Sequence, residues 1–162
     1  MNANHPDLNT NHPAPPTVAF VGASWAALLA GSVAFVVGLW NAEMALSEKG
    51  YYLTVLMFGL FSAVSLQKSV RDRIEGITVS PIYFGIAWVS VGASLLLLAV
   101  GLWNSLLMPS EKGFYAMSFA LSLFAAVAVQ KNVRDLAIST PESGQAERSL
   151  RLDSKNLSNL DV

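Results

Sequence analysis

The residues in this sequence whose types and spacing could support chemistry are two glutamate–lysine pairs. Glu48-Lys49 and Glu111-Lys112 each lie in a short polar segment between two apolar runs. A carboxylate beside an ammonium group can serve in acid–base catalysis when both are positioned against a substrate in a site that excludes water. We expect both segments to be exposed to water, where such pairs act as ordinary surface charges. The sequence therefore predicts that the protein is not an enzyme.

Metal and cofactor chemistry has equally little support. The chain contains no cysteine, which excludes disulfides, thiolate metal sites and thiol catalysis. Its two histidines, His5 and His12, lie in a polar, proline-rich N-terminal arm that offers no preformed geometry for a metal ion. Weak metal binding by this arm is the less favoured alternative, and we expect no metal and no cofactor.

The composition is that of a membrane protein. Of the 162 residues, 53% are hydrophobic and 13% are charged, whereas a soluble domain carries about 25% charged residues. The net charge of −1 provides no field that would attract nucleic acid. Four runs have no charged residue: Val18–Trp40, Tyr51–Gln67, Ile82–Trp103 and Phe114–Gln130. As a helix, a run of about 23 residues spans roughly 34 Å, and the shorter runs of about 17 residues reach the lower limit for crossing a bilayer.

We therefore predict an all-α, polytopic membrane protein with four transmembrane helices, built as two tandem helical hairpins. Polar residues beside the shorter runs are expected to continue the same helices into the headgroup region. For the tail, disorder is favoured over a weak helix on the membrane surface. The predicted segments are a disordered cytoplasmic arm (1–17), a first hairpin (18–73), a cytoplasmic connector (74–81), a second hairpin (82–136) and a polar cytoplasmic tail (137–162).

An internal repeat relates the two hairpins. The segment that begins GLWNAEMALSEKGYY at Gly38 aligns without a gap with the segment that begins GLWNSLLMPSEKGFY at Gly101, an offset of 63 residues (101 − 38). An even number of spans separates equivalent positions, so both copies enter the membrane from the same side. We expect a parallel repeat with a pseudo-twofold axis along the membrane normal.

The first recurring motif lies in the linker of each hairpin. We expect its tryptophan and tyrosine at the membrane–water boundary, its asparagine at a helix end and its glutamate in the first turn of the returning helix. Ser47 and Ser110 are the expected N-caps, and the motif's glycine is expected to let two helices approach closely. A small external binding site formed by both linkers is the alternative. The residues are Trp40, Asn41, Glu48, Lys49, Gly50 and Tyr52 in the first copy, and Trp103, Asn104, Glu111, Lys112, Gly113 and Tyr115 in the second.

The second recurring motif is Gln-Lys-x-Val-Arg-Asp at the far end of each returning helix. Its lysine and aspartate are four residues apart, so they can pair on one helix face. We interpret the motif as an interface anchor whose cations meet anionic headgroups, with docking of a cytoplasmic partner as the alternative. The anchor residues are Gln67, Lys68, Arg71 and Asp72, then Gln130, Lys131, Arg134 and Asp135.

The distribution of basic residues predicts the orientation. The two hairpin linkers contain only Lys49 and Lys112. We therefore expect the N- and C-termini in the cytoplasm. The side with the arm, the connector and the tail has more basic residues near the spans: Lys68, Arg71, Arg73, Lys131 and Arg134.

The spans themselves indicate helix packing rather than transport of ions. No acidic, basic or histidine side chain lies deep in a predicted span, and such residues usually mark ion pathways and proton relays. Small residues recur at helical spacing, as in Gly85, Gly92 and Ala99, and favour contact between membrane helices. We predict a small self-associating bundle with a structural, assembly or stress-related role, whose partners are the lipid bilayer and either further copies of itself or other membrane proteins. An oligomeric transporter or channel for a small neutral solute is the alternative.

The recurrence of GLWN, SEKG-[YF]-Y and Q-K-x-V-R-D in this order, twice, resembles the YiaA/YiaB family of bacterial inner membrane proteins. The resemblance covers about residues 18 to 136, both hairpins, and leaves out the arm and the tail. It implies two copies of a two-helix domain and location in the bacterial inner membrane. It implies no substrate, catalytic residue or cofactor.

Overall fold

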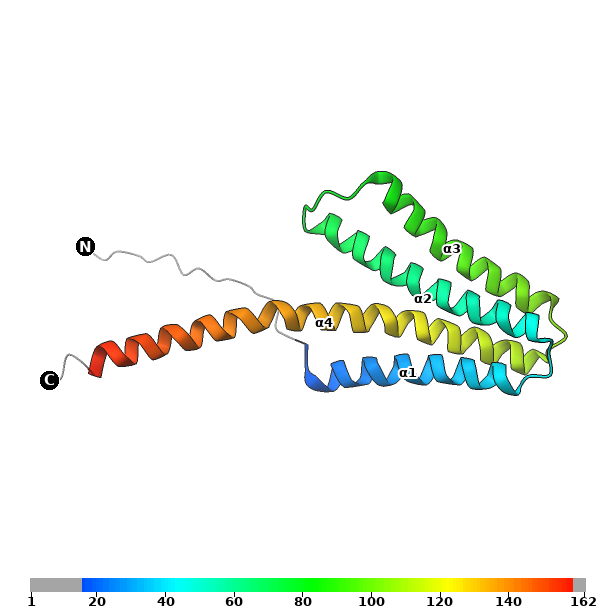
Figure 1. Ribbon diagram of the computed structural model, residues 1–162, viewed down its shortest axis with the longest axis horizontal. Coiled ribbons are helices and arrows are strands. Elements are labelled where there is room, and N and C mark those ends of the chain that lie inside the picture. The colour runs from blue at the N-terminus through cyan, green and yellow to red at the C-terminus, as the bar shows by residue number, and fades with distance from the viewer. Residues whose placement is uncertain (1–15, 159–162) are drawn as a thin grey trace.

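The structure, a computed structural model, describes the backbone of residues 16–158 and the side chains of residues 16–137. These residues form four helices: α1 (Val18–Asn41), α2 (Leu46–Ile74), α3 (Pro81–Asn104) and α4 (Pro109–Ser158) (Figure 1). All four are long and apolar enough to cross a membrane, α4 through its part Pro109–Ala137. The prediction of an all-helical protein with four such helices in two tandem two-helix units is confirmed.

The molecule has two ends of different character. We call the end with the α1–α2 and α3–α4 connections the linker end, and the end with the α2–α3 connection the basic end (Figure 1). At the basic end α2 is closed by Gly76, whose φ of +75° suits glycine. The N–H groups of Gly76 and Ile77 donate to the carbonyls of Arg73 and Asp72, at 3.3 and 2.9 Å. This pattern ends α2 and turns the chain into α3.

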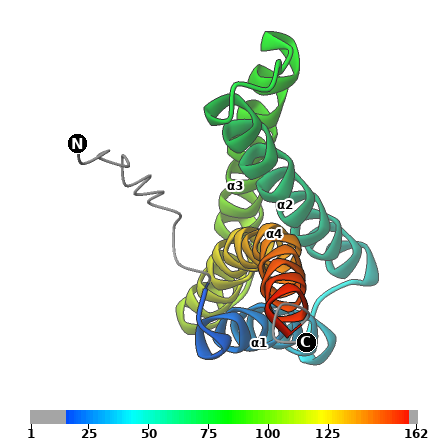
Figure 2. The ribbon, with the colours of Figure 1, turned by 90° about the vertical axis from the view of Figure 1, so that its left-hand side faces the viewer.

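The helices of one hairpin do not pack mainly on each other. Helix α1 packs against α4, α2 packs against α3, and the two pairs meet where α2 contacts α4 (Figures 1 and 2). The first helix of each copy therefore lies on the second helix of the other copy. Neither hairpin buries its contact surface alone, so the copies form one interlocked bundle.

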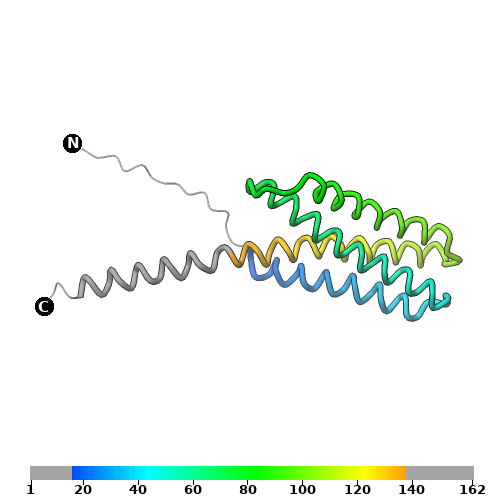
Figure 3. Tube along the Cα trace, turned by 45° about the horizontal axis from the view of Figure 1, so that its top comes forward, coloured from blue at the N-terminus to red at the C-terminus, as the bar shows by residue number. Residues whose placement is uncertain are grey.

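The core lies near the linker end. Phe35, Tyr52, Leu56, Tyr115 and Phe119 are almost completely buried there. The rings of Tyr52 and Tyr115, which are equivalent positions of the repeat, stack with centroids 6.0 Å apart. Towards the basic end the α2/α3 pair diverges from the α1/α4 pair (Figures 1 and 3). The bundle is thus closed at one end and open at the other.

Close approach of the helices depends on glycines inside the spans, not on those of the linker motif. A Cβ atom on Gly38 would lie 2.6 Å from the ring of Phe114, and one on the equivalent Gly101 would lie 2.7 Å from the ring of Tyr51. The expectation for Gly50 and Gly113 is wrong, because a Cβ atom there would meet nothing within 4 Å. The reason is that both face outward from the first turn of their helices.

The polar tail differs from the expected disorder. Helix α4 continues beyond its apolar part to Ser158. Extending a helix that already exists costs no new nucleation, so polar residues can follow the span in the same conformation. The arm over residues 1–15, with His5 and His12, lies outside the described residues.

Candidate functional site

The linker motif closes helix ends in the same way in both copies. The side-chain amides of Asn41 and Asn104 donate to the carbonyls of Val37 and Val100, at 2.7 and 2.8 Å. These carbonyls lie in the last turns of α1 and α3, so each asparagine side chain folds back onto the end of its own helix. Trp40 and Trp103 beside them are 82% and 86% exposed. The asparagines lie at helix ends, where the sequence places them.

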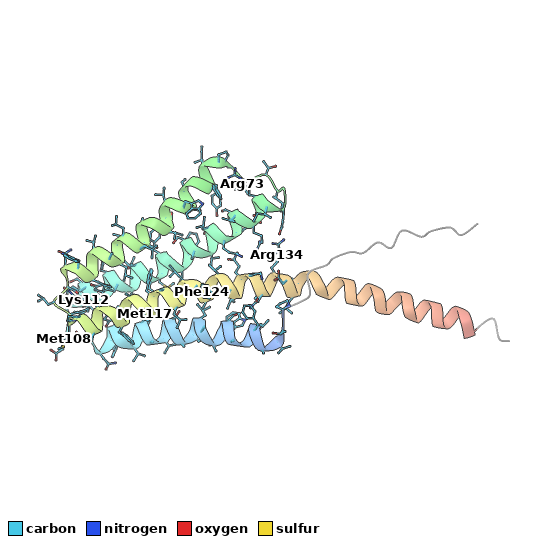
Figure 4. The ribbon with its side chains drawn as sticks, turned by 180° about the vertical axis from the view of Figure 1, so that it is seen from behind. Arg73, Met108, Lys112, Met117, Phe124 and Arg134 are labelled. Carbon is cyan, nitrogen blue, oxygen red and sulfur yellow. The ribbon has the colours of Figure 1, made fainter. Side chains whose placement is uncertain are left out.

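The motif's lysine also serves a helix end. Lys49 Nζ donates to the carbonyl of Trp40 at 2.9 Å, and Lys112 Nζ contacts the carbonyl of Trp103 at 3.5 Å. Each lysine belongs to the first turn of the returning helix and reaches the last turn of the preceding one. A cation is favourable there, because a helix C-terminus carries partial negative charge. Figure 4 shows Lys112 at this end.

The motif's glutamate replaces the predicted serine cap. Glu48 Oε2 accepts a hydrogen bond from the backbone N–H of Ala45 at 2.9 Å, and Glu111 Oε2 accepts one from Met108 at 2.7 Å. The prediction of Ser47 as an N-cap is wrong, because α2 begins one residue earlier, at Leu46, with Ala45 as N-cap. Ser110 is likewise inside α4, which begins at Pro109. Proline suits the first helical position, since it lacks an N–H group.

A pocket of about 470 Å³ lies between the two linkers. Glu48 and Glu111 line it from the two copies, together with Asn41, Glu43 and Tyr52. The structure thus brings the glutamates of both linkers to one pocket, whereas the lysines turn to carbonyls at helix ends. Both glutamates already accept backbone hydrogen bonds, so the described contacts of the motif are those of a structural joint.

The anchor motifs differ between the copies. Lys131 pairs with Asp135 at 3.9 Å, as the spacing predicts, whereas Asp72 in the first copy contacts Arg71 at 3.6 Å. Lys68 is exposed. Arg134, labelled in Figure 4, forms an ion pair with Glu75 at the end of α2 and thereby joins the two copies.

A buried polar contact at this end was not foreseen. Asn132 occupies the variable position of the motif, is 1% exposed and donates from Nδ2 to Ser24 Oγ at 2.9 Å. The equivalent Ser69 donates to the carbonyl of Ser65 in its own helix instead. The one signal in the sequence was that Asn132 differs from Ser69 at a position inside an otherwise repeated motif. Glu75 has no signal of this kind, because it lies outside the motif.

A groove of about 710 Å³ opens between α2, α3 and α4 where the two helix pairs diverge. Its polar residues all come from the anchor motifs and lie at its outer end: Gln67 and Arg71 on α2, then Lys131, Arg134 and Asp135 on α4. Arg71 Nε and Gln67 Oε1 are buried and have no hydrogen-bond partner. Its apolar walls are formed by Ala63, Leu66, Val70 and Ile74 (α2), Trp88 and Val91 (α3), and Leu123, Phe124 and Val127 (α4).

This groove is the candidate functional site. It combines an apolar interior with cations and unsatisfied polar atoms at its mouth, which is the pattern of a site for a molecule with an apolar body and a polar head. Among residues 16–137, no cluster of three or more histidine, aspartate or glutamate side chains could hold a metal ion.

Comparisons with known proteins identify the repeat. The model of the yiaA/B two helix domain matches the chain twice, over residues 20–72 and 83–135. The chain is 56% identical over 127 residues to the inner membrane protein YiaA of Escherichia coli (strain K12), an alignment that covers 78% of this chain and 88% of that relative. It is 40% identical over 60 residues to the uncharacterized membrane protein YubF of Bacillus subtilis (strain 168), covering 36% of this chain and 69% of YubF. No solved structure matches the chain.

The two matched segments correspond to the two interlocked hairpins, and the relatives are membrane proteins without a stated activity. The described helices and the similarity to YiaA, an inner membrane protein, agree on a multi-pass protein of the inner membrane. The chain therefore belongs to the YiaA/YiaB two-helix-domain family.

Proposed function

We propose that the chain is a non-enzymatic membrane bundle that associates with further copies of itself through the outer face of α3, in a structural or assembly role. The observation that carries this proposal is a stripe of small residues on that face. Gly85, Gly92 and Ala99 are exposed, and a Cβ atom on either glycine would meet nothing within 4 Å. They are thus unlike Gly38 and Gly101, which contact aromatic side chains of neighbouring helices within the same chain.

The corresponding face of α1 supports this reading. The positions equivalent to Gly92 and Ala99 are Leu29 and Val36, which are 59% and 41% exposed. Lipid accepts large apolar side chains, so contact with lipid gives no reason for small ones. Membrane helices instead associate where small residues let their backbones come close. The difference between α1 and α3 favours contact with another helix at α3.

The experiment compares two exposed glycines, one on α3 and one on α1. Gly92→Val places a side chain on the α3 stripe and leaves contacts inside the chain intact, since the space is open. We expect the dimer fraction to fall in native mass spectrometry and in crosslinking within membranes. Gly22→Val is the control, because Gly22 also faces open space but lies on α1. Equal oligomer distributions in both variants and the parent chain would refute the proposal.

A catalytic role and transport receive less support. The glutamates and lysines of the linkers already serve helix ends, and the core near the linker end is filled by aromatic side chains. A filled core leaves no room for a solute between the helices at that end of the described bundle. Passage of a neutral solute between copies stays the alternative, and flux into liposomes measures it.

We further propose that the basic end faces the cytoplasm, with a pseudo-twofold axis along the membrane normal. The described part of the basic end has five cationic side chains against three carboxylates, whereas the linker end has two against three. Excess basic charge marks the cytoplasmic side. Because the chain has no cysteine, Ala45→Cys and Thr78→Cys each provide a single thiol. A membrane-impermeant thiol reagent should label the first in spheroplasts and the second only after lysis; the reverse pattern would invert the orientation.

A further inference from the structure

We propose that the groove between α2, α3 and α4 binds one phospholipid with an anionic headgroup, with an acyl chain along its apolar walls and the phosphate among the cations at its mouth. The inference goes beyond the proposed self-association, because it concerns a different face of the bundle. It rests on three features of the groove: its length, its charge and its unsatisfied polar atoms.

The length of the groove fits one leaflet. Along α2 its lining residues run from Ala63 to Ile74, and along α4 they run from Leu123 to Asp135. Eleven residues of helix rise about 16 Å, which matches half of a hydrocarbon core of about 30 Å. The groove therefore extends from the bilayer centre to the headgroup level. An acyl chain has this length and orientation. A water-soluble ligand would have to leave water and cross the hydrocarbon core to reach the inner part of the groove.

The charge changes at the level where a headgroup lies. Arg71, Lys131 and Arg134 line the mouth of the groove, and Asp135 is the one carboxylate among the lining residues. Lys131 pairs with Asp135, and Arg134 pairs with Glu75, so both cations are held in place. A phosphate placed between these side chains would accept charge-assisted hydrogen bonds. Anionic lipids gain about 1 kcal/mol from each basic residue near the surface, or about fivefold in affinity.

The unsatisfied atoms at the mouth provide the third feature. Arg71 Nε is a buried donor and Gln67 Oε1 a buried acceptor, each without a protein partner. Buried polar atoms without partners are rare and costly, so a partner from outside the chain is expected. A phosphatidylglycerol headgroup offers both, since its phosphate accepts hydrogen bonds and its glycerol hydroxyls donate them.

A second copy of the chain is the competing occupant, and the features above disfavour it. The exposed side chains of α1 at this end, Val18 and Phe20, are apolar, so a neighbouring α1 would leave Arg71 and Gln67 unsatisfied. The stripe of small residues on α3, Gly85 and Gly92, is exposed and does not line the groove. Contact between copies at Gly85 and Gly92 and lipid binding in the groove therefore use adjacent surfaces of α3, which meet at Trp88.

The experiment measures lipid retained by the full chain in detergent. Native mass spectrometry with equal amounts of dioleoyl phosphatidylglycerol and dioleoyl phosphatidylcholine should show one bound phosphatidylglycerol, preferred by about tenfold. Arg71→Gln and Lys131→Gln should each weaken this binding about fivefold. Lys68→Gln is the matched control, because it removes a cation from the same end without altering the lining residues.

A second pair of variants tests the apolar part without changing charge. Val127→Trp fills the groove and should abolish binding of phosphatidylglycerol. Val133→Trp places the same side chain on the exposed surface of α4 and should not change this binding. Equal binding of both lipids, an equal loss in Lys68→Gln and Lys131→Gln, or lipid retained by Val127→Trp would each overturn the proposal. A change of oligomeric state in Val127→Trp with lipid binding unchanged would assign the groove to a second copy instead.

Discussion

The linker end and the basic end are built from the same repeat, yet they differ in how far the two copies agree. At the linker end the asparagine, glutamate and lysine contacts of one copy recur in the other. At the basic end Ser69 and Asn132 make different bonds, and the two arginines of the motif have different partners. The repeated contacts close the bundle, whereas the differing ones lie at the end that also holds the groove. Divergence between copies thus marks the end where binding is proposed.

The largest effect is expected from the core at the closed linker end. Phe119 is 1% exposed and contacts Gly59 of α2 and Phe35 of α1. Phe119→Ala should lower the free energy of unfolding by about 3 kcal/mol, because the cavity loses its packing contacts even when lipid is the solvent. Unfolding in mixed micelles, followed by circular dichroism, measures this. Phe124→Ala is the control, since Phe124 is 74% exposed (Figure 4); equal losses would contradict a packed core.

The equivalence of the copies at the linker end can be tested directly. Gly38→Val and Gly101→Val should each lower the free energy of unfolding by about 1–3 kcal/mol, because each new side chain meets an aromatic ring of the other copy. The same unfolding measurement applies. Gly50→Val, in open space, serves as the control. A loss of stability in only one of the two variants would show that the copies are not equivalent at this end.

A smaller effect should reveal the inequivalence at the basic end. Asn132→Ala removes the hydrogen bond from α4 to Ser24 of α1 and should cost about 0.5–1.5 kcal/mol. Ser69→Ala at the equivalent position should change stability by less than about 0.5 kcal/mol, because its hydroxyl bonds only to its own helix. Thermal unfolding of the two variants side by side measures the difference. Equal losses would make this end as symmetric as the other.

The smallest effect concerns the ion pair between Arg134 and Glu75. Both side chains are partly exposed, at 26% and 34%, and exposed pairs contribute about 0.5 kcal/mol or less. Glu75→Gln should therefore lower stability slightly in dilute buffer and have no effect at 1 M salt, where charges are screened. The melting temperature at both salt concentrations measures this. A large, salt-independent loss would mean that the pair holds the two helix pairs together.

The identity of the four spans follows from local sequence, and so does the recurrence of the joint between them. An uncharged run of sufficient length must be a helix in lipid, because only a helix satisfies its backbone within the segment. The caps were predicted less well. Ser47 has the right chemistry for an N-cap, but Glu48 reaches back to Ala45 and the helix begins earlier. Such boundaries depend on competition between neighbouring side chains.

The sequence by itself determined the membrane as solvent, the number of spans and the two-copy organisation, since each is a property of contiguous residues. Only the tertiary structure decided that α1 packs on α4 and α2 on α3, because sequence spacing does not say which apolar faces meet in lipid. It also decided which glycines are contacts and which are exposed. The groove arises from the same cause: it exists where two interlocked helix pairs diverge, and no single segment encodes that angle.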